Sequence, residues 1–295
     1  MPTTLPTLAF AGIGLMGLPM CRRLLAAGYS LRVWNRSVEK CAALQALGAT
    51  VVETPAQLCQ ADIVLLCLAD TQAVRDVVFA RGGIAEGARS GQILVDHSSL
   101  EPGATREMAA RLLADTGMRW VDAPVSGGVA GAQAGSLAIM AGGRHEDIER
   151  VRPHLLRLGE RLTYMGDVGA GQVAKVCNQM IVACNALVIA EVVALAERAG
   201  VDANLLAPAL AGGFADSRPL QILAPQMASS DFEPVKWHVR TLLKDLDTAV
   251  GLSRAEGSAT PMSGLAAQLM RQHASQGNLQ RDPATLIQLY RGKTP

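Results

Sequence analysis

This sequence has few aromatic residues, a net charge close to zero and no closely spaced pair of cysteines. Its 295 residues include three Trp, three Tyr and four Phe, and its formal net charge is +1. Nucleic-acid-binding surfaces gather basic side chains, and those for single strands add aromatic rings on which bases stack. A polybasic membrane-surface protein needs the same excess of positive charge. The composition therefore argues against both classes, and we expect neither a nucleic-acid nor a membrane partner.

Six cysteines are present, but they form no Cys-x-x-Cys pair and have no histidine at zinc-finger spacing. Scattered cysteines in apolar surroundings are typical of reduced, packed thiols. We therefore expect no disulfide framework and no metal site. The segment Met1–Thr7 has no basic stretch ahead of an apolar one, so we expect no signal peptide and a cytoplasmic location.

The first half of the chain alternates short apolar runs with helical patterns, which predicts a doubly wound, mostly parallel α/β sheet. At about 100–200 residues per domain, the length also predicts two domains. We interpret residues 1–168 as a Rossmann domain. The predicted strands are Thr7–Ala11, Leu31–Trp34, Thr50–Val52, Ile63–Cys67, Ile93–Val95, Trp120–Val121 and Leu137–Ala141. The helices predicted between them include Pro19–Ala27, Val38–Leu47, Thr71–Phe79 and Gly103–Thr116.

Strand patterns end near residue 168, and the rest of the chain is helical in pattern. Residues 169–199 predict one long helix, which joins the first domain to an all-α domain over 169–295. The stretch Met180–Ala196 is apolar enough for a membrane span, but Asn185 and Glu191 interrupt it. We therefore predict a buried central helix, and we assign substrate binding and oligomerisation to the all-α domain.

A glycine motif follows the first predicted strand. The sequence Gly12-Ile13-Gly14-Leu15-Met16-Gly17 lies between that strand and a helix. In a dinucleotide-binding fold the first glycine permits a tight turn, the second lets a pyrophosphate approach, and the third allows close helix packing. A glycine-rich turn without a ligand is the alternative, which the position in a βαβ unit disfavours. We therefore predict that these six residues bind the phosphates of a cofactor.

The end of the second predicted strand indicates which dinucleotide is preferred. An NAD site usually places Asp or Glu there to bind the ribose hydroxyls. This chain has Asn35, Arg36 and Ser37 instead, so no carboxylate repels a 2′-phosphate and Arg36 can pair with one. Ser37 offers another donor, or caps the next helix. We predict NADP(H) as the preferred cofactor, with NAD(H) as the alternative.

Three further blocks and a short later motif extend this pattern. They are Asp96–Leu100 (DHSSL), Asp122–Gly128 (DAPVSGG), Gly166–Gln179 (GDVGAGQVAKVCNQ) and Lys244–Leu246 (KDL). With these blocks in this order and spacing, the chain resembles the β-hydroxyacid dehydrogenase family over almost its whole length. That family includes 3-hydroxyisobutyrate dehydrogenases, tartronate semialdehyde (2-hydroxy-3-oxopropionate) reductases and glyoxylate or succinic semialdehyde reductases.

Lys175 is the residue that we expect to move a proton. It lies within an apolar helical pattern, where burial lowers the pKa of a lysine from about 10.4 toward the range that acid–base catalysis uses. The resemblance implies that Lys175 protonates the carbonyl oxygen as hydride arrives, or removes the hydroxyl proton in the reverse direction. On the residues alone, a lysine that extends its ammonium to solvent at a helix start is an equal alternative.

The resemblance also implies contacts for the substrate and the nicotinamide. Ser126, Gly127 and Gly128 follow a strand end, where they hold the substrate carboxylate or, in the simpler alternative, form a flexible turn. The further substrate contacts are Asn178, Gln179, Trp237 and Asp245. The further cofactor contacts are Leu68, Ala69, Ser99 and Lys244. For Trp237 the alternative is an ordinary core position, and for Lys244 and Asp245 it is an exposed charge pair. For Ser99 a turn that ends a strand is an equal alternative on the residues alone, and for Gln179 the alternative is an ordinary helix position.

Gln179 departs from the commoner family pattern, which has Asn four positions after the lysine. Asn178 lies one turn beyond Lys175 and can orient the reacting oxygen, and the pair Asn178–Gln179 is similar to that of tartronate semialdehyde reductases. We therefore predict an NADP(H)-dependent reductase of a small carboxylate-bearing semialdehyde or keto acid, which acts as a homodimer or homotetramer. The alternatives are a 3-hydroxyisobutyrate dehydrogenase, a glyoxylate or succinic semialdehyde reductase, an imine reductase, and a cofactor-binding scaffold without catalysis.

Overall fold

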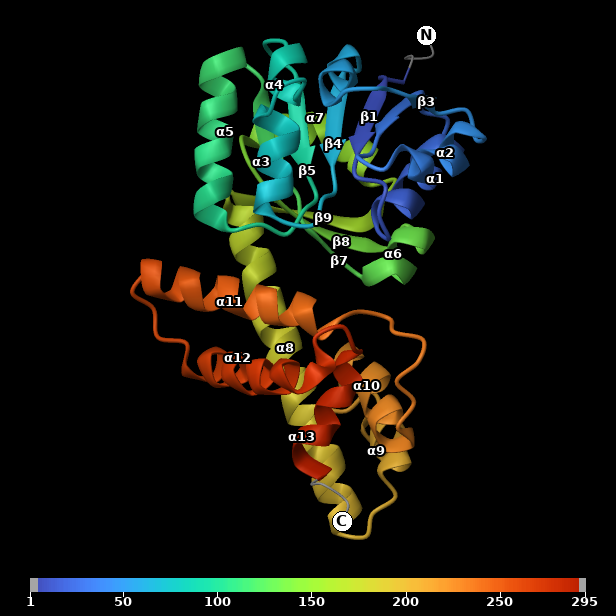
Figure 1. Cartoon of the computed structure of the whole chain (residues 1–295), viewed down its shortest axis with the longest axis vertical. Helices are drawn as coiled ribbons and strands as arrows, with labels where there is room; N and C mark the ends of the chain where they lie inside the picture. The colour runs from blue at the N-terminus through green and yellow to red at the C-terminus, as the bar shows by residue number, and fades with distance from the viewer. Residues whose placement is uncertain (1–4, 292–295) are drawn as a thin grey trace. The chain divides into compact units, whose positions relative to one another are not determined.

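The computed structural model describes residues 5–291. The chain divides into two compact units, the first ending at Lys175 and the second beginning at Val176. The first unit contains every strand of the described residues, and the second contains helices and loops (Figure 1). The predicted combination of a Rossmann-type α/β part and an all-α part, joined by a long helix, is confirmed.

A nine-stranded sheet forms the centre of the first unit. Its strands are β1 (Leu8–Ala11), β2 (Leu31–Trp34), β3 (Thr50–Val51), β4 (Ile63–Leu66), β5 (Ile93–Asp96), β6 (Arg119–Asp122), β7 (Val125–Ser126), β8 (Leu137–Gly142) and β9 (Gly159–Gly166). Their order is β3-β2-β1-β4-β5-β6-β8-β7, with β9 also beside β8. The pairs from β3 to β6 are parallel, whereas β8 is antiparallel to β6 and β7. The predicted mostly parallel sheet is therefore confirmed.

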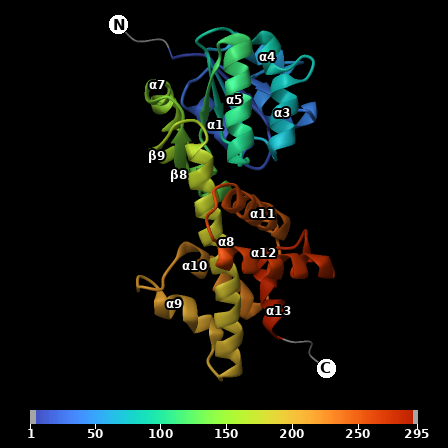
Figure 2. The same ribbon diagram turned by 90° about the vertical axis from the view of Figure 1, so that its left-hand side faces the viewer.

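Helices cover both faces of this sheet. They are α1 (Gly17–Ala26), α2 (Ala42–Gln45), α3 (Thr71–Phe79), α4 (Ile84–Gly87), α5 (Pro102–Thr116), α6 (Gly128–Ala134) and α7 (His145–Leu155). Leu8 and Phe10 of β1 belong to the core that includes α1 and α7, whereas Ala9 and Ala11 belong to the core that includes α3 and α5. Figures 1 and 2 show α3 and α5 side by side on one face. Because successive side chains of a strand point to opposite faces, a strand buried along its whole length needs cover on both.

The structure differs from the sequence-based expectation at three elements of the first unit. β7 and β9 were not predicted, because β7 has two residues and β9 is a largely exposed strand without the apolar run that marks an inner one. The expected helix Val38–Leu47 is instead a 3₁₀ turn over Val38–Cys41, followed by the single turn of α2.

The second unit is built around α8 (Ala170–Arg198), which begins in the first unit. Its other helices are α9 (Leu206–Leu210), α10 (Arg218–Ser229), α11 (Val239–Ala255), α12 (Pro261–His273) and α13 (Gln288–Arg291). Leu187 and Val193 of α8 pack in one core with Leu223, Leu246 and Met270 from α10, α11 and α12. By length and composition, α8 is the one described helix that could cross a membrane, a property that it shares with the core helices of soluble proteins. One face of α8 packs in this core, as predicted for a central helix, but another face is not buried, since Ile181 and Leu195 are exposed.

Candidate active site

The glycine motif lies at the carboxyl end of β1, between β2 and β4. Gly12 has a φ of +101°, and a Cβ there would collide with the carbonyl oxygen of Cys67, directly after β4. The Gly12 N–H donates to the Trp34 carbonyl at 3.1 Å. A Cβ on Gly14, in contrast, would meet no atom within 4 Å. The loop therefore packs against the backbone after β4 at Gly12, whereas no atom of the protein covers Gly14. This arrangement lets a phosphate approach the backbone at Gly14.

Asn35 joins the glycine motif to the turn after β2. Its Oδ1 accepts from the Ile13 N–H at 2.9 Å, and its Nδ2 donates to the Ser37 carbonyl at 2.9 Å. The side chain of Asn35 therefore shapes two predicted cofactor-binding segments through their backbones. Arg36, the next residue, is exposed.

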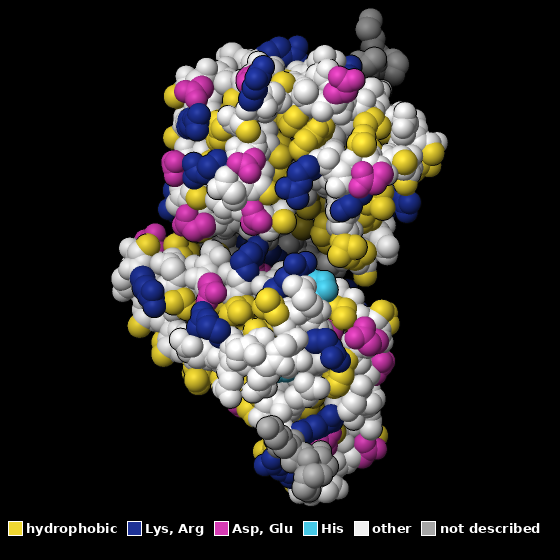
Figure 3. Space-filling view, viewed as in Figure 1, with side chains coloured by type: hydrophobic (Ala, Val, Ile, Leu, Met, Phe, Trp, Pro, Cys, Tyr) yellow, Lys and Arg dark blue, Asp and Glu magenta, His cyan; other side chains and the backbone are white. Residues whose placement is uncertain are grey.

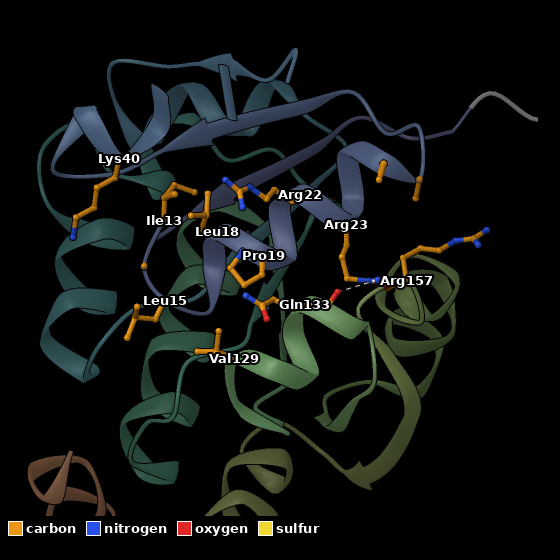
Figure 4. Close-up of a pocket in the computed structure, with 13 residues that line it drawn as sticks. Ile13, Leu15, Leu18, Pro19, Arg22, Arg23, Lys40, Val129, Gln133 and Arg157 are labelled. Carbon is orange, nitrogen blue, oxygen red and sulfur yellow. Dashed lines mark hydrogen bonds between the residues drawn. The ribbon is translucent and has the colours of Figure 1, made fainter. Parts of the chain in front are cut away.

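A cavity of about 870 Å³ opens beside the glycine motif and runs along α1 (Figure 4). Residues 13–15 of the motif and Lys40 line it, and so do Gln133 of α6 and Arg157. Arg23 crosses from α1 to these last two residues, where its Nε donates to the Arg157 carbonyl at 2.9 Å and its Nη1 to the Gln133 carbonyl at 3.2 Å. The cavity therefore has basic side chains along an apolar helix surface, and it meets the predicted phosphate site at the motif.

Lys40 is a candidate cofactor residue that the sequence analysis missed. It shares the cavity lining with Gly14 and lies four positions after Arg36. The available signal was a second basic residue close behind Arg36, and the structure places Lys40 in the 3₁₀ turn over Val38–Cys41. The turn after β2 thus supplies two cations, Arg36 and Lys40, and neutral Asn35 in place of a carboxylate.

Two buried carboxylates lie at the carboxyl ends of β5 and β6, where Asp96 and Asp122 are in register. Asp96 Oδ1 accepts from the Ser98 N–H at 2.9 Å, and Ser98 Oγ accepts from the Leu68 N–H at 2.9 Å. Burial raises the pKa of Asp96 to about 7, the hydrogen bonds from Ser98 oppose the shift, and the charge of Asp122 adds to it. Ser98 therefore fixes the loop after β4 that contains Leu68. The next residue, Ser99, is half-buried, and its contact with the cofactor remains a prediction.

Asp122 fixes the start of α8. Its Oδ1 accepts from the Gly169 N–H at 2.7 Å, and its Oδ2 accepts from the Gln172 N–H at 2.9 Å. Burial raises the pKa of Asp122, and these backbone hydrogen bonds oppose the shift. Lys175 follows Gln172 by one turn of the same helix and is half-buried. A carboxylate on β6 thus anchors the helix that carries the predicted proton-transfer residue.

The predicted carboxylate-binding loop follows β7, which ends at Ser126. Gly127 has a φ of +136°, a conformation that favours glycine, and it turns the chain directly into α6. A Cβ on Gly128 would meet no atom within 4 Å. The backbone after Ser126 is therefore sharply turned and open beside Gly128.

Asp245 of α11 is the centre of a polar cluster in the second unit. Its side chain is 8 % exposed, Gln179 Nε2 donates to its Oδ2, and Lys244 Nζ lies 3.3 Å from its Oδ1. Asn178 Nδ2 donates to Gln179 Oε1 at 2.8 Å. These four residues form a continuous chain of contacts between α8 and α11. Gln179 is therefore a link between Asn178 and Asp245.

Trp237 lies in the segment that leads into α11, half-buried against the core of the second unit. The loop before α13 fixes this segment, because the Lys236 N–H donates to Asp282 Oδ2 at 2.9 Å and the Val239 N–H to the Arg281 carbonyl at 3.0 Å. Asp282 is fully buried. No local sequence pattern marks Asp282, because its partner lies 46 positions earlier in the chain.

The predicted site residues of the first unit lie in loops after its strands and at the starts of α1 and α6, apart from Ser126 at the end of β7 and Lys175 on α8. Ligands of open α/β sheets bind beyond the carboxyl ends of the strands, where the strand order changes direction. The buried residues are Gly12, Ile13, Gly17 and Asp245, and the exposed ones are Gly14, Leu15, Arg36, Ala69 and Gly128. The half-buried ones are Met16, Asn35, Ser37, Leu68, Ser99, Ser126, Gly127, Lys175, Asn178, Gln179, Trp237 and Lys244.

Two family models match the chain. The model for the NAD binding domain of 6-phosphogluconate dehydrogenase matches residues 7–166. The model for the NAD-binding domain of NADP-dependent 3-hydroxyisobutyrate dehydrogenase matches residues 169–290. Together they extend over both units.

Individual proteins are similar over nearly the whole chain. The chain is 37% identical to the 2-hydroxy-3-oxopropionate reductase of Escherichia coli, over 95% of this chain and 96% of that protein. It is 33% identical to the NAD-dependent L-serine dehydrogenase of Pseudomonas aeruginosa, over 96% and 97% of the two chains. A solved structure of Mycobacterium tuberculosis 3-hydroxyisobutyrate dehydrogenase with L-serine has a TM-score of 0.87 at 30% identity, over 98% of this chain and 100% of that one.

Proposed function

Because this chain belongs to the β-hydroxyacid dehydrogenase family, we propose that it reduces a small carboxylate-bearing semialdehyde or keto acid with NADPH, and oxidises the hydroxy acid in reverse. Membership supports a pyridine-nucleotide-dependent oxidoreductase that acts on the CH–OH group of β-hydroxy acids. The observation that carries the finer proposal is Lys175, half-buried on α8 one turn after Gln172, which is anchored at the carboxyl ends of β5 and β6.

The residues at the end of β2 fit a dinucleotide with a 2′-phosphate. Gly14 is open to a phosphate, while Arg36 and Lys40 supply cations near neutral Asn35. A hydrogen bond to a charged group contributes about 1.5–3 kcal/mol, so each cation favours NADP(H) over NAD(H). When bound, the nicotinamide supplies hydride to the carbonyl carbon of the substrate.

Lys175 is the proton donor and acceptor of the proposed reaction. In reduction its ammonium protonates the carbonyl oxygen as the C–H bond forms, and in oxidation the neutral amine removes the hydroxyl proton. Asn178, one turn later on α8, donates to the same oxygen without a change of charge, and its Nδ2 also donates to Gln179 Oε1. Ser126 and the turned backbone at Gly127 and Gly128 hold the substrate carboxylate.

For the substrate we propose 2-hydroxy-3-oxopropionate. The support is the Asn178–Gln179 pair and the 37% identity to a reductase of that compound. One methylene changes discrimination by about 1–3 kcal/mol, so compounds of similar size need direct comparison. In this proposal, Asn178 and Gln179 of the polar cluster determine which of these substrates is accepted, and Trp237 forms a wall of the substrate site.

The test is a comparison of kcat/KM across substrates and cofactors. The panel contains 2-hydroxy-3-oxopropionate, glyoxylate, succinic semialdehyde and methylmalonate semialdehyde with NADPH and with NADH, and L-serine and 3-hydroxyisobutyrate for oxidation. We expect the highest value for 2-hydroxy-3-oxopropionate with NADPH. A higher value for another compound reassigns the substrate within the class. Bound NADPH without turnover of any compound supports a scaffold instead.

We further propose a homodimer or homotetramer in the cytoplasm. α8 leaves a row of apolar side chains exposed on one face, with Ile181 at 64% and Leu195 at 69% and with Val188 and Val192 between them. Exposed apolar rows of this kind mark protein interfaces. On the face shown in Figure 3, acidic and basic side chains are interspersed over each unit. Light scattering of the purified protein measures the assembly directly.

A further inference from the structure

Gln172 is a fully buried glutamine one turn before Lys175 on α8. Its side chain reaches the loop after β5, where Oε1 accepts from the Leu100 N–H at 3.0 Å and Nε2 donates to the Ser98 carbonyl at 2.8 Å. Its own N–H donates to Asp122 Oδ2 at 2.9 Å. One residue thus connects the loop after β5, the end of β6 and the helix of Lys175.

The loop that Gln172 holds is the one predicted to contact the nicotinamide. Ser99 lies between the two residues that bond to Gln172, so one side chain constrains its backbone from both sides. Ser98 extends this connection, because its Oγ accepts from the Leu68 N–H at 2.9 Å. Both loops after β4 and β5 are therefore tied to α8 through Gln172.

We propose that Gln172 is a positioning residue that sets the hydride donor and the proton donor at the separation that one carbonyl group requires. This inference rests on the proposed function, in which Ser99 contacts the nicotinamide and Lys175 moves the proton. Hydride and proton go to adjacent atoms of the same substrate, so both donors must be aligned at once. A misplacement of about 1 Å costs about 10²-fold in rate.

The first test is Gln172→Met, which keeps the length of the side chain and removes both hydrogen bonds. We expect kcat to fall about 10- to 100-fold, because the loop predicted to contact the nicotinamide is no longer bonded to the helix that carries Lys175. The Kd for NADPH stays within about threefold, since the glycine motif and the turn after β2 hold the rest of the dinucleotide. The deuterium isotope effect on kcat, measured with NADPH deuterated at the transferred position, rises as hydride transfer becomes the slowest step.

Gln92→Met is the matched control. Gln92 is 6 % exposed, and it precedes β5, at the opposite end of that strand from Ser98. Its side chain also bonds to backbone, with Oε1 accepting from the Arg89 N–H at 2.7 Å and Nε2 donating to the Ala61 carbonyl at 2.7 Å. Gln92→Met therefore lowers the Tm as Gln172→Met does, but it leaves kcat and the isotope effect unchanged.

Equal effects of the two substitutions, with a lower Tm and an unchanged kcat and isotope effect, would overturn the proposal. Should Gln172→Met fail to fold, Gln172→Asn, which withdraws the amide by one methylene, is measured in the same way. The fluorescence of bound NADPH needs no turnover and reports the surroundings of the nicotinamide. If the wild-type protein reduces no carbonyl compound, the proposed function fails and the positioning role fails with it, whereas in an active protein this emission is a second readout of that role. A change of emission in Gln172→Met supports that role, and an unchanged emission overturns it.

Discussion

The polar side chains around the predicted site residues are bonded differently in the two units. In the first unit, Asp122 and Gln172 bond to backbone groups of loops and of a helix start. In the second, Gln179, Lys244 and Asp245 bond to one another. A side chain that bonds to backbone fixes the course of a loop, whereas side chains that bond to each other fix the position of charge. We therefore expect a change to Asp122 or Gln172 to displace the loops that they hold, and a change to Gln179, Lys244 or Asp245 to alter the charge that the cluster presents.

The largest expected effect comes from Lys175, at the end of the first unit. Lys175→Met removes the group that we propose moves the proton, so we expect kcat to fall by about 10²–10⁴-fold while the Kd for NADPH is unchanged. Lys236→Met, at an exposed lysine of the second unit, serves as the control in steady-state assays and NADPH titrations. Near-normal kcat in Lys175→Met would remove the central element of the proposed mechanism.

A substitution of Asp245 tests the role of the side-chain cluster in the second unit. Asp245→Asn takes the charged partner from Lys244 and Gln179, a loss of about 1–3 kcal/mol, so kcat/KM falls about 10- to 100-fold. The Kd for NADPH shows a smaller change than kcat/KM. Asp247→Asn is the control, because Asp247 lies on the same helix but pairs with Arg271 at the surface. A loss confined to NADPH affinity would show that the two units are not functionally distinct in this way.

Arg36 and Lys40 sharpen the assignment of the first unit to the cofactor. Arg36→Ala and Lys40→Ala each raise the Kd for NADPH about tenfold, the effect of one charged hydrogen bond, and leave the Kd for NADH nearly unchanged. Arg22→Ala, at an exposed position on the lining of the same cavity, is the control. Equal losses for both cofactors would show that these cations do not contact a 2′-phosphate.

The smallest expected effect is the pH dependence of stability that Asp96 introduces. Burial raises its pKa from 3.8 to about 7 in the folded protein, so the folded state favours the protonated form. This contribution to the free energy of unfolding is fully present below pH 4, is lost as the pH rises toward 7, and is constant above that. In Asp96→Asn the Tm relative to wild type therefore increases between pH 5 and pH 7.5, by a few degrees. Exposed Asp231→Asn shows no such trend, and a pH-independent difference in Asp96→Asn contradicts the raised pKa.

Elements with a local signal were predicted from the sequence. Inner strands such as β1 and β4 are continuous apolar runs, and the glycine motif is recognisable because its spacing matches a turn between a strand and a helix. β9 was not predicted, since most of its side chains are exposed. For the site, Lys175 and Asp245 were predicted from motifs. The cluster around Asp245 was not, because α8 and α11 meet only after the helices pack.

The order of the elements and the glycine motif are properties of the sequence, because each depends on residues close together in the chain, and the family follows from several such short motifs taken in order. The partners of the buried polar groups are a result of the tertiary structure. Gln172 bonds to residues 72 and 74 positions away, and Gln179 to one 66 positions away. The first pair of bonds exists because the parallel strand order places the ends of β5 and β6 at one edge of the sheet, next to the start of α8. A buried amide must find a donor or acceptor, but only the packed fold determines which one it finds.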